Sequence, residues 1–379
     1  MDFKSRLIHS GLDRDPFTGA SGVPLYLSST FDQRNIGTSG DYDYTRSGNP
    51  TREALEGAVA DLEGGELGLA FASGMAATSS VLLLFAPGDH LIVSEDVYGG
   101  TFRVLTQLLS RWGLTVSFVD STNPEVIEKA LTPATRGIFV ESPSNPLLKI
   151  TDLAFVADFA KKHKLISIVD NTFATPYLQR PLEKGFDLVV HSATKFLNGH
   201  SDVLAGLAIA REKELGLRLR FIQNAFGAVL GVQDSWLLLR GIKTLAVRLD
   251  ASQKGAERLA LRLQEHPLVS RIFYPGLATH PGRDIHFRQS SGPGAVVSFE
   301  LQSAELTQQF LKRVKLPLVA VSLGGVESIL SHPATMSHAS MPKDEREKRG
   351  ISDAVIRLSV GLEDPDDLWA DFRSALECR

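Results

Sequence analysis

Six short runs of residues that are apolar on both faces recur along the first part of the chain, separated by intervals long enough for helices. Strands buried on both faces belong to parallel sheets covered by helices, and each parallel connection needs a crossover of about a dozen residues or more. The pattern therefore predicts an α/β fold with a mostly parallel sheet. The six predicted strands are Leu67–Ala72, His90–Ser94, Thr115–Val119, Gly137–Val140, Leu165–Val169 and Leu188–His191.

Three parts of the chain differ in their pattern. Residues 1–50 show no sustained helical or strand period, which predicts an extended arm. Residues 51–240 hold the six runs and are predicted to form the domain that carries the main site. A helical stretch from Ile242 to Glu265 then precedes alternating runs such as Ala295–Leu301, which predicts a smaller α+β domain over residues 241–379. A chain of 379 residues exceeds the roughly 250–300 at which one core stops growing, so two packed domains are expected.

The charge and the cysteine content exclude several classes of protein. A formal net charge of −4 at pH 7 gives no general attraction to nucleic acid or to an anionic membrane. The single cysteine, Cys378, has no partner in the chain, so disulfides and cysteine-ligated zinc or iron–sulfur clusters are excluded. The histidines form no H-E-x-x-H pattern, and no metal site is predicted.

One uncharged stretch, from Leu67 to Gly88, is long enough to cross a bilayer. Serine, threonine, glycine and proline interrupt it, so a buried strand followed by a buried helix is expected instead. The beginning of the chain holds charges and no apolar run, so neither a secretory signal nor a membrane anchor is predicted. We therefore expect a cytoplasmic protein.

Polar residues that follow two of the runs carry the strongest chemical signal. Asp170 follows the fifth run, and Ser192-Ala-Thr194-Lys195 lies at the end of the sixth. In an open α/β sheet, ligands bind beyond the carboxyl ends of the strands, so both groups should face one crevice. A buried lysine there can form a Schiff base, and an acidic residue can hold a pyridinium nitrogen protonated. The pairing predicts a site for pyridoxal 5'-phosphate (PLP).

Other interpretations stay open on this pattern alone. An aspartate after a strand often caps a helix, and a lysine after a strand is often a solvated loop residue. The stretch Ser192–Lys195 also fits the S-x-x-K motif of acyl-serine enzymes. That motif needs S-D-N and K-T-G partners, but Ser201–Val203 and Lys243–Leu245 both differ from them at the third position.

Phosphate binding needs a turn that opens a helix after a strand, where free backbone N–H groups point at the anion. The sequence Ser73-Gly74-Met75 has this form after the first run. The N–H groups of Gly74 and Met75 are expected to face the phosphate, and the hydroxyls of Ser192 and Thr194 would add to them.

Nine ordered motifs that span almost the whole chain resemble the Cys/Met-metabolism PLP enzymes, the family of cystathionine β-lyase, cystathionine γ-lyase, cystathionine γ-synthase and methionine γ-lyase. The resemblance implies the fold-type I, aminotransferase-like architecture of PLP-dependent transferases. It also implies a homotetramer, a dimer of dimers, whose active sites are shared between subunits. The motifs are Tyr44–Thr51, Ser73–Ala77, Asp96–Thr101, Glu141–Pro146, Val169–Thr172, His191–Lys195, Gly199–Asp202, Ser322–Ser328 and Arg357–Gly361.

The same resemblance assigns residues to the cofactor. Lys195 would hold PLP as a Schiff base and act as the general acid and base, and Tyr98 would stack on the ring as the second catalytic residue. Asp170 would pair with the pyridine nitrogen. Tyr44 and Arg46 in the arm would reach the phosphate of a neighbouring subunit. The other residues assigned to the phosphate are Gly74, Met75, Ser192 and Thr194.

It also assigns residues to the substrate. Arg357 would bind the α-carboxylate, because a planar guanidinium offers two parallel donors. Asn145 and Ser328 would assist it. The remaining substrate-binding residues predicted in this way are Asp43, Arg103 and Glu327.

Two sets of residues favour different reactions within the family. Asp43, Arg103 and Glu327 are polar at positions that γ-synthases and γ-lyases also keep polar. Three longer stretches look most like one bacterial type of cystathionine β-lyase, which keeps these polar positions as well. We therefore predict a β-lyase that cleaves L-cystathionine to homocysteine, pyruvate and ammonia in methionine biosynthesis, with cystathionine γ-synthase or γ-lyase as the alternative. The stretches are Phe226–Asp234, Ile329–His338 and Pro342–Gly350.

Overall fold

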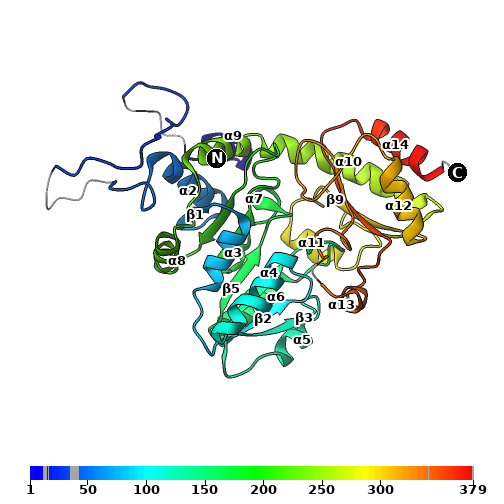
Figure 1. The fold of residues 1–379 in the computed structure, drawn as a ribbon, viewed down its shortest axis with the longest axis horizontal. Coiled ribbons are helices and arrows are strands. Elements are labelled where there is room, and N and C mark those ends of the chain that lie inside the picture. The colour runs from blue at the N-terminus through cyan, green and yellow to red at the C-terminus, as the bar shows by residue number, and fades with distance from the viewer. Residues whose placement is uncertain (12–14, 16, 35–41, 340, 378–379) are drawn as a thin grey trace.

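The computed structural model describes residues 1–11, 15, 17–34, 42–339 and 341–377, so Cys378 lies outside the described residues. Within this part of the chain, strands form one seven-stranded and one five-stranded sheet. The chain builds the larger sheet first, in blue to green, and the smaller sheet afterwards, in yellow to red (Figure 1).

The larger sheet has the strand order β1-β7-β6-β5-β4-β2-β3. All neighbouring pairs from β6 to β3 are parallel, and β7 runs antiparallel to both β6 and β1. The predicted α/β fold with a mostly parallel sheet is confirmed. The strands are β1 Leu67–Phe71, β2 His90–Ser94, β3 Thr115–Val119, β4 Thr135–Glu141, β5 Ile166–Asp170, β6 Leu188–Ser192 and β7 Gly206–Ala210.

Strand β7 is absent from the sequence-based prediction. It inserts between β1 and β6, with Gly206 opposite Ser192 on one side and Phe71 on the other. The residues that join β6 to β7, 193–205, form turns and no helix, and the chain returns antiparallel. Five small and apolar residues after a polar motif gave no strand signal of their own, and only pairing with β1 and β6 defines the strand.

Helices cover both faces of the larger sheet. Side chains of α2, α6 and α9 pack on one face, and side chains of α3 and α8 pack on the other. The helices of this part are α2 Pro50–Glu63, α3 Gly74–Leu82, α4 Gly99–Arg103, α5 Pro124–Lys129, α6 Leu153–His163, α7 Thr175–Leu178, α8 Lys213–Phe226 and α9 Val232–Ile242, with shorter helical turns η1 Val104–Leu108, η2 Leu109–Trp112 and η3 Pro181–Lys184.

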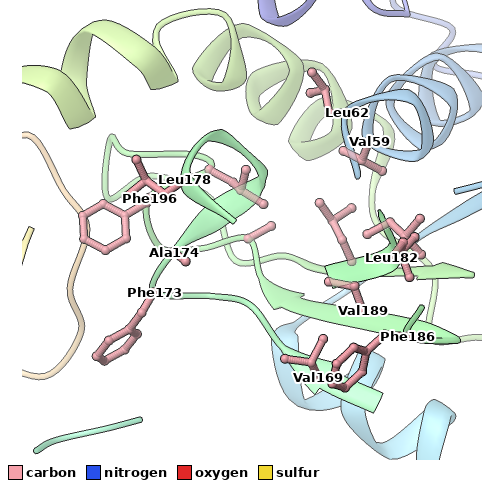
Figure 2. Close-up of a cluster of buried hydrophobic side chains, with 14 of the residues drawn as sticks. Val59, Leu62, Val169, Phe173, Ala174, Leu178, Leu182, Phe186, Val189 and Phe196 are labelled. Atoms are coloured by element: carbon pink, nitrogen blue, oxygen red, sulfur yellow. The ribbon is translucent and has the colours of Figure 1, made fainter. Parts of the chain in front are cut away.

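Helix α2 shows how local sequence sets an element. Asn49 caps its N-terminus by accepting from the N–H of Thr51, Pro50 fits the first turn, and Gly64 ends it in the left-handed region. Local sequence signals therefore set both ends of this helix. Val59 and Leu62 of α2 belong to the buried cluster drawn in Figure 2.

The smaller sheet has the order β10-β11-β12-β9-β8 and is antiparallel except between β10 and β11. The long helix α10 joins it to the larger part of the chain (Figure 1). Its elements are α10 Leu245–Glu265, β8 Val269–Phe273, α11 Arg283–Gln289, β9 Val296–Leu301, α12 Ala304–Arg313, β10 Leu318–Val319, β11 Ile329–Ser331, α13 Lys343–Lys348, β12 Val355–Ser359 and α14 Pro365–Glu377.

The sequence predicts an irregular N-terminal segment, but part of this segment is helical. Helix α1, Phe3–His9, packs on its own chain, where Lys4 pairs with Asp250 and Arg6 with Asp61. A helix of this length has too few turns to show a clear spacing of apolar residues, so its contacts with the rest of the chain determine whether it forms. Most of the described residues that follow, in the ranges 17–34 and 42–48, extend away from the body (Figure 1).

The uncharged stretch from Leu67 folds as a buried strand, β1, followed by the helix α3, as predicted. In the part of the chain that the structure describes, no helix combines the length and the apolar character that a membrane crossing needs.

Candidate active site

A cavity of about 680 Å³ opens at the carboxyl ends of β4, β5 and β6, where residues of both sheets meet. This position is the expected one, because ligands of open α/β sheets bind beyond the carboxyl ends of the strands. Ten of the fifteen predicted site residues line the cavity: Gly74, Met75, Tyr98, Arg103, Asn145, Asp170, Ser192, Thr194, Lys195 and Arg357.

Lys195 lies in a tight turn just after β6 and is largely buried. Its Nζ atom donates to Oγ of Ser322 at 2.7 Å. Burial, together with the nearby positive charge of Arg357, lowers the pKa of the Lys195 amine to about 8. The amine is therefore far more available as a free base near neutral pH than an exposed lysine is.

Two carboxyl groups face the cavity from neighbouring strands. Asp170 ends β5 directly opposite Glu141, which ends β4. Burial raises the pKa of both groups, and the pKa of Glu141 lies well above its ordinary range because Asp170 and Asp96 also repel its charge. The backbone N–H of Thr172 donates to Asp170 at 3.0 Å and favours its ionised form. Glu141 therefore takes a proton first, which leaves Asp170 as the anion.

An anion cradle lies where α3 begins. The N–H groups of Gly74 and Met75 open the helix and have no acceptor within the described ranges, while Ser73 accepts the N–H of Ala76. A Cβ atom on Gly74 would lie 2.8 Å from Cβ of Ser192, so only glycine leaves this space. Thr194 completes the rim, with its hydroxyl held by the backbone of Ala205. A phosphate fits this donor set.

Tyr98 presents an aromatic ring to the cavity and is half exposed. Its N–H donates to Oε2 of Glu141 at 3.0 Å, which fixes the turn before α4. A Cβ atom on Gly100 would lie 2.6 Å from both the ring of Tyr98 and Sδ of Met75, so the ring packs tightly at its base. A flat aromatic cofactor ring could stack here opposite Asp170.

Arg357 provides the cation on the opposite wall. It is buried on β12, and its Nη1 donates to Oδ1 of Asn145 at 2.8 Å. Its Nη2 donates to the carbonyl of Ser322 at 2.7 Å and to Oγ of Ser331 at 2.9 Å. Burial lowers the pKa of Arg357 to about 10, and Glu141 opposes that shift. Because Nε of Arg357 has no hydrogen-bond partner among the described residues, this group can receive a carboxylate.

Five predicted site residues do not line this cavity. Asp43, Tyr44 and Arg46 lie on the extended arm, where the Arg46 guanidinium sits 5.4 Å from the ring of Tyr44. Ser328 is fully buried, and its hydroxyl donates to Oε2 of Glu363 at 2.8 Å. The geometry therefore gives the predicted substrate contact of Ser328 no support, and the fifth residue, Glu327, precedes it in the chain.

The structure adds cavity residues that sequence reasoning did not assign a role. Ser322 joins Lys195 to Arg357, and it holds a positive φ of 100° although it is not glycine. Glu141 and Ser322 both begin motifs quoted above, so a signal was present for them. Ser331 lies outside those motifs, and only its contact with Arg357 identifies it.

Comparisons with known proteins agree with this geometry. The sequence model of the family "Cys/Met metabolism PLP-dependent enzyme" matches residues 4–377. A cystathionine β-lyase of Bacillus subtilis (strain 168) is 56% identical over 374 residues, 99% of this chain and 96% of that protein. A cystathionine γ-lyase of the same organism is 51% identical and covers 100% of both chains. The crystal structure of cystathionine γ-lyase from Lactobacillus plantarum with L-serine has a TM-score of 0.97 at 47% identity, covering 99% of this chain and 98% of its own.

Proposed function

This chain belongs to the Cys/Met metabolism PLP-dependent enzymes, and we propose that it works as a cystathionine β-lyase that converts L-cystathionine to homocysteine, pyruvate and ammonia. The observation that carries the proposal is the buried amine of Lys195, whose pKa is lowered to about 8, in one cavity with Asp170 and the phosphate cradle. The identity of 56% to a β-lyase over nearly the full length supports this reaction.

The residues present fit PLP. The cradle at Gly74 would hold the phosphate, the ring of Tyr98 would stack on the pyridine, and Asp170 would accept from the pyridine nitrogen. The bound cofactor supplies an electron-withdrawing ring that stabilises the negative charge left on the substrate Cα. Because Glu141 holds a proton, Asp170 stays ionised and can pair with the pyridine nitrogen.

Proton transfer belongs to Lys195 in this proposal. With a pKa of about 8, its amine can take the Cα proton and then protonate the homocysteine sulfur as the Cβ–S bond breaks. The hydroxyl of Ser322 holds the amine in the cavity. Arg357 and Asn145 bind the α-carboxylate, and Arg103, which lines the same cavity, faces the other end of the substrate.

We also place the arm in a neighbouring subunit. Tyr44 is 46% exposed, and Phe17 and Leu27 on the same segment are largely exposed on a chain that extends away from the body (Figure 1). These features support a homotetramer, a dimer of dimers, in which Tyr44 and Arg46 reach the phosphate of another subunit. Asp43 and Glu327 would then act on the substrate only in the assembled cytoplasmic enzyme.

A γ-lyase or γ-synthase is the second candidate. It is favoured by the 51% identity to a cystathionine γ-lyase over the full length of both chains. Chemistry at Cγ needs a second proton removal, at Cβ, whereas β-elimination expels the thiolate directly. The two reactions therefore give different keto acids from the same substrate.

Product analysis separates these reactions. The purified protein should be yellow, and borohydride reduction should attach the cofactor irreversibly to the peptide that contains Lys195. Incubation with L-cystathionine should then give pyruvate. Predominant 2-oxobutyrate would replace the proposal by a γ-lyase, and cystathionine formed from cysteine and an activated homoserine ester would replace it by a γ-synthase.

A further inference from the structure

Arg248, in the first turn of α10, is a buried cation without an acidic partner among the contacts that the structure describes. Only 6% of it is exposed. Its Nη1 donates to the carbonyl of Phe196 at 2.7 Å, and its Nη2 donates to the carbonyl of Leu197 at 3.4 Å and to that of Gly241 at 2.9 Å. Burial lowers the pKa of Arg248 to about 10. Burying a guanidinium is costly, so main-chain carbonyls must be held in place to satisfy it.

Two of those carbonyls belong to the turn that carries Lys195. Within this turn, the N–H of Gly199 already binds the carbonyl of Lys195 at 2.9 Å. The next two carbonyls, of Phe196 and Leu197, receive their donors from Arg248. Gly199 has a φ of +75°, and a Cβ atom there would lie 2.1 Å from Nη1 of Arg248. Glycine therefore lets the guanidinium lie against the lysine turn.

The opposite side of the turn is closed by a second glycine. Gly324, with a φ of +81°, packs so closely that a Cβ atom would lie 2.5 Å from the nitrogen of Phe196 and 2.9 Å from the carbonyl carbon of Lys195. The segment that contains Gly324 also supplies Ser322, the hydrogen-bond acceptor of the lysine amine. The turn is thus clamped between Arg248 and this segment.

Helix α10 extends this clamp to the smaller sheet. Ser252, one turn after Arg248, donates to the carbonyl of Gly361 at 3.0 Å, just beyond the strand that carries Arg357. Arg248 thus connects the lysine turn with the helix on which the substrate-binding wall packs.

We propose that Arg248 is a positioning residue: it fixes the backbone of Lys195 so that the amine stays against Ser322, and it ties the lysine turn to α10. The inference rests on the proposed role of Lys195. If the turn loosens, the Lys195 amine moves toward water and its pKa rises from about 8 toward the ordinary value of 10.5. The titratable groups that share the cavity with this amine are Tyr98, Arg103, Glu141, Asp170 and Arg357.

Competitive acetylation of the full-length chain, freed of PLP, measures this effect without turnover. The degree of labelling of Lys195 is followed by mass spectrometry across neutral to alkaline pH. Arg248→Lys keeps the positive charge but loses the paired donors of the guanidinium. In this variant the pH midpoint of Lys195 labelling should rise by about 1 pH unit, which lowers the fraction of free amine near neutral pH about tenfold. PLP capture should slow by the same factor.

Arg346→Lys is the matched control, because Arg346 is also 6% exposed and also donates to a main-chain carbonyl, that of Ile351. Both variants should lower the melting temperature, and only Arg248→Lys should move the midpoint of Lys195. If Arg248→Lys folds poorly, Thr244→Val removes the acceptor of the Arg248 Nε atom, 3.0 Å away, and should give a smaller rise.

An unchanged midpoint in both Arg248→Lys and Thr244→Val would overturn the proposal and leave Arg248 a structural residue. A different result would contradict the proposed function, namely that borohydride attaches no cofactor to Lys195 of the unmodified chain. In that case a shifted midpoint in Arg248→Lys would still support the clamp.

Discussion

The two walls of the cavity are built in different ways. On the wall formed by the larger sheet, Asp170 and Glu141 end adjacent parallel strands and face the cavity because of strand register alone. On the opposite wall, Arg357 lies within β12 and is held by Asn145 and Ser322, which come from loops. The first wall concentrates acid groups suited to a cofactor ring, and the second presents a cation suited to a carboxylate. Lys195 belongs to the first wall and is hydrogen-bonded to the second.

The most severe test of this division removes the group that joins the two walls. Lys195→Ala should be colourless and should lower kcat about 10³-fold or more, because a positioned general acid or base contributes roughly 10²–10⁴. Absorbance spectra and pyruvate formation measure the two effects. Lys243→Ala, outside the cavity, should stay yellow; a fully yellow Lys195→Ala would contradict the assignment.

Acid should destabilise the fold through two buried histidines, of which only His338 lies near Arg357 of the second wall. His338 and His286 are buried, and burial lowers the pKa of each to about 4. Since the unfolded chain binds these protons at about pH 6.5, each histidine destabilises the fold as pH falls from about 6.5 to 4. His338→Gln should recover about 3 kcal/mol of this loss near pH 4, measured by urea unfolding. His9→Gln, on an exposed residue, should recover nothing.

The cation itself can be tested without removing its charge. Arg357→Lys keeps a positive group but loses the fork, so the α-carboxylate should bind less well by about 2 kcal/mol, roughly 30-fold in kcat/KM. The cofactor spectrum should not change, since the first wall is intact. Steady-state kinetics with L-cystathionine check this prediction, and a loss of yellow colour would show that the two walls are not separable.

The contact across the walls should have the smallest effect. Ser322→Ala removes the acceptor of the Lys195 amine, which costs about 1 kcal/mol, or roughly five- to tenfold in kcat. The pH–rate profile is the decisive measurement, because a change confined to substrate binding would alter KM and leave the profile in place. Ser270→Ala, on an exposed residue, serves as the control.

The sequence was most informative about the first wall. Asp170 and Lys195 were identified because each follows an apolar strand. Ligands of open α/β sheets bind beyond the carboxyl ends of the strands, and applying this rule needs no knowledge of the tertiary packing. Ser331 escaped prediction because its role depends on Arg357, and Ser328 was predicted from resemblance but binds Glu363 instead of facing the cavity. Strand β7 and helix α1 were missed for the same reason, since pairing with β1 and β6 defines the strand and contacts with the rest of the chain define the helix.

By itself, the sequence determined the α/β class, because strand periodicity is a local property of the chain, and nine ordered motifs indicated the family. Strand-end polarity also predicted that Asp170 and Lys195 share one cavity. Only the tertiary structure decided which side chains complete the site. Arg357 and Asn145 are 212 residues apart, and Phe196, whose carbonyl accepts from Arg248, lies 52 residues before it. Such contacts follow from how α10 and the smaller sheet pack on the larger one, which no local pattern records.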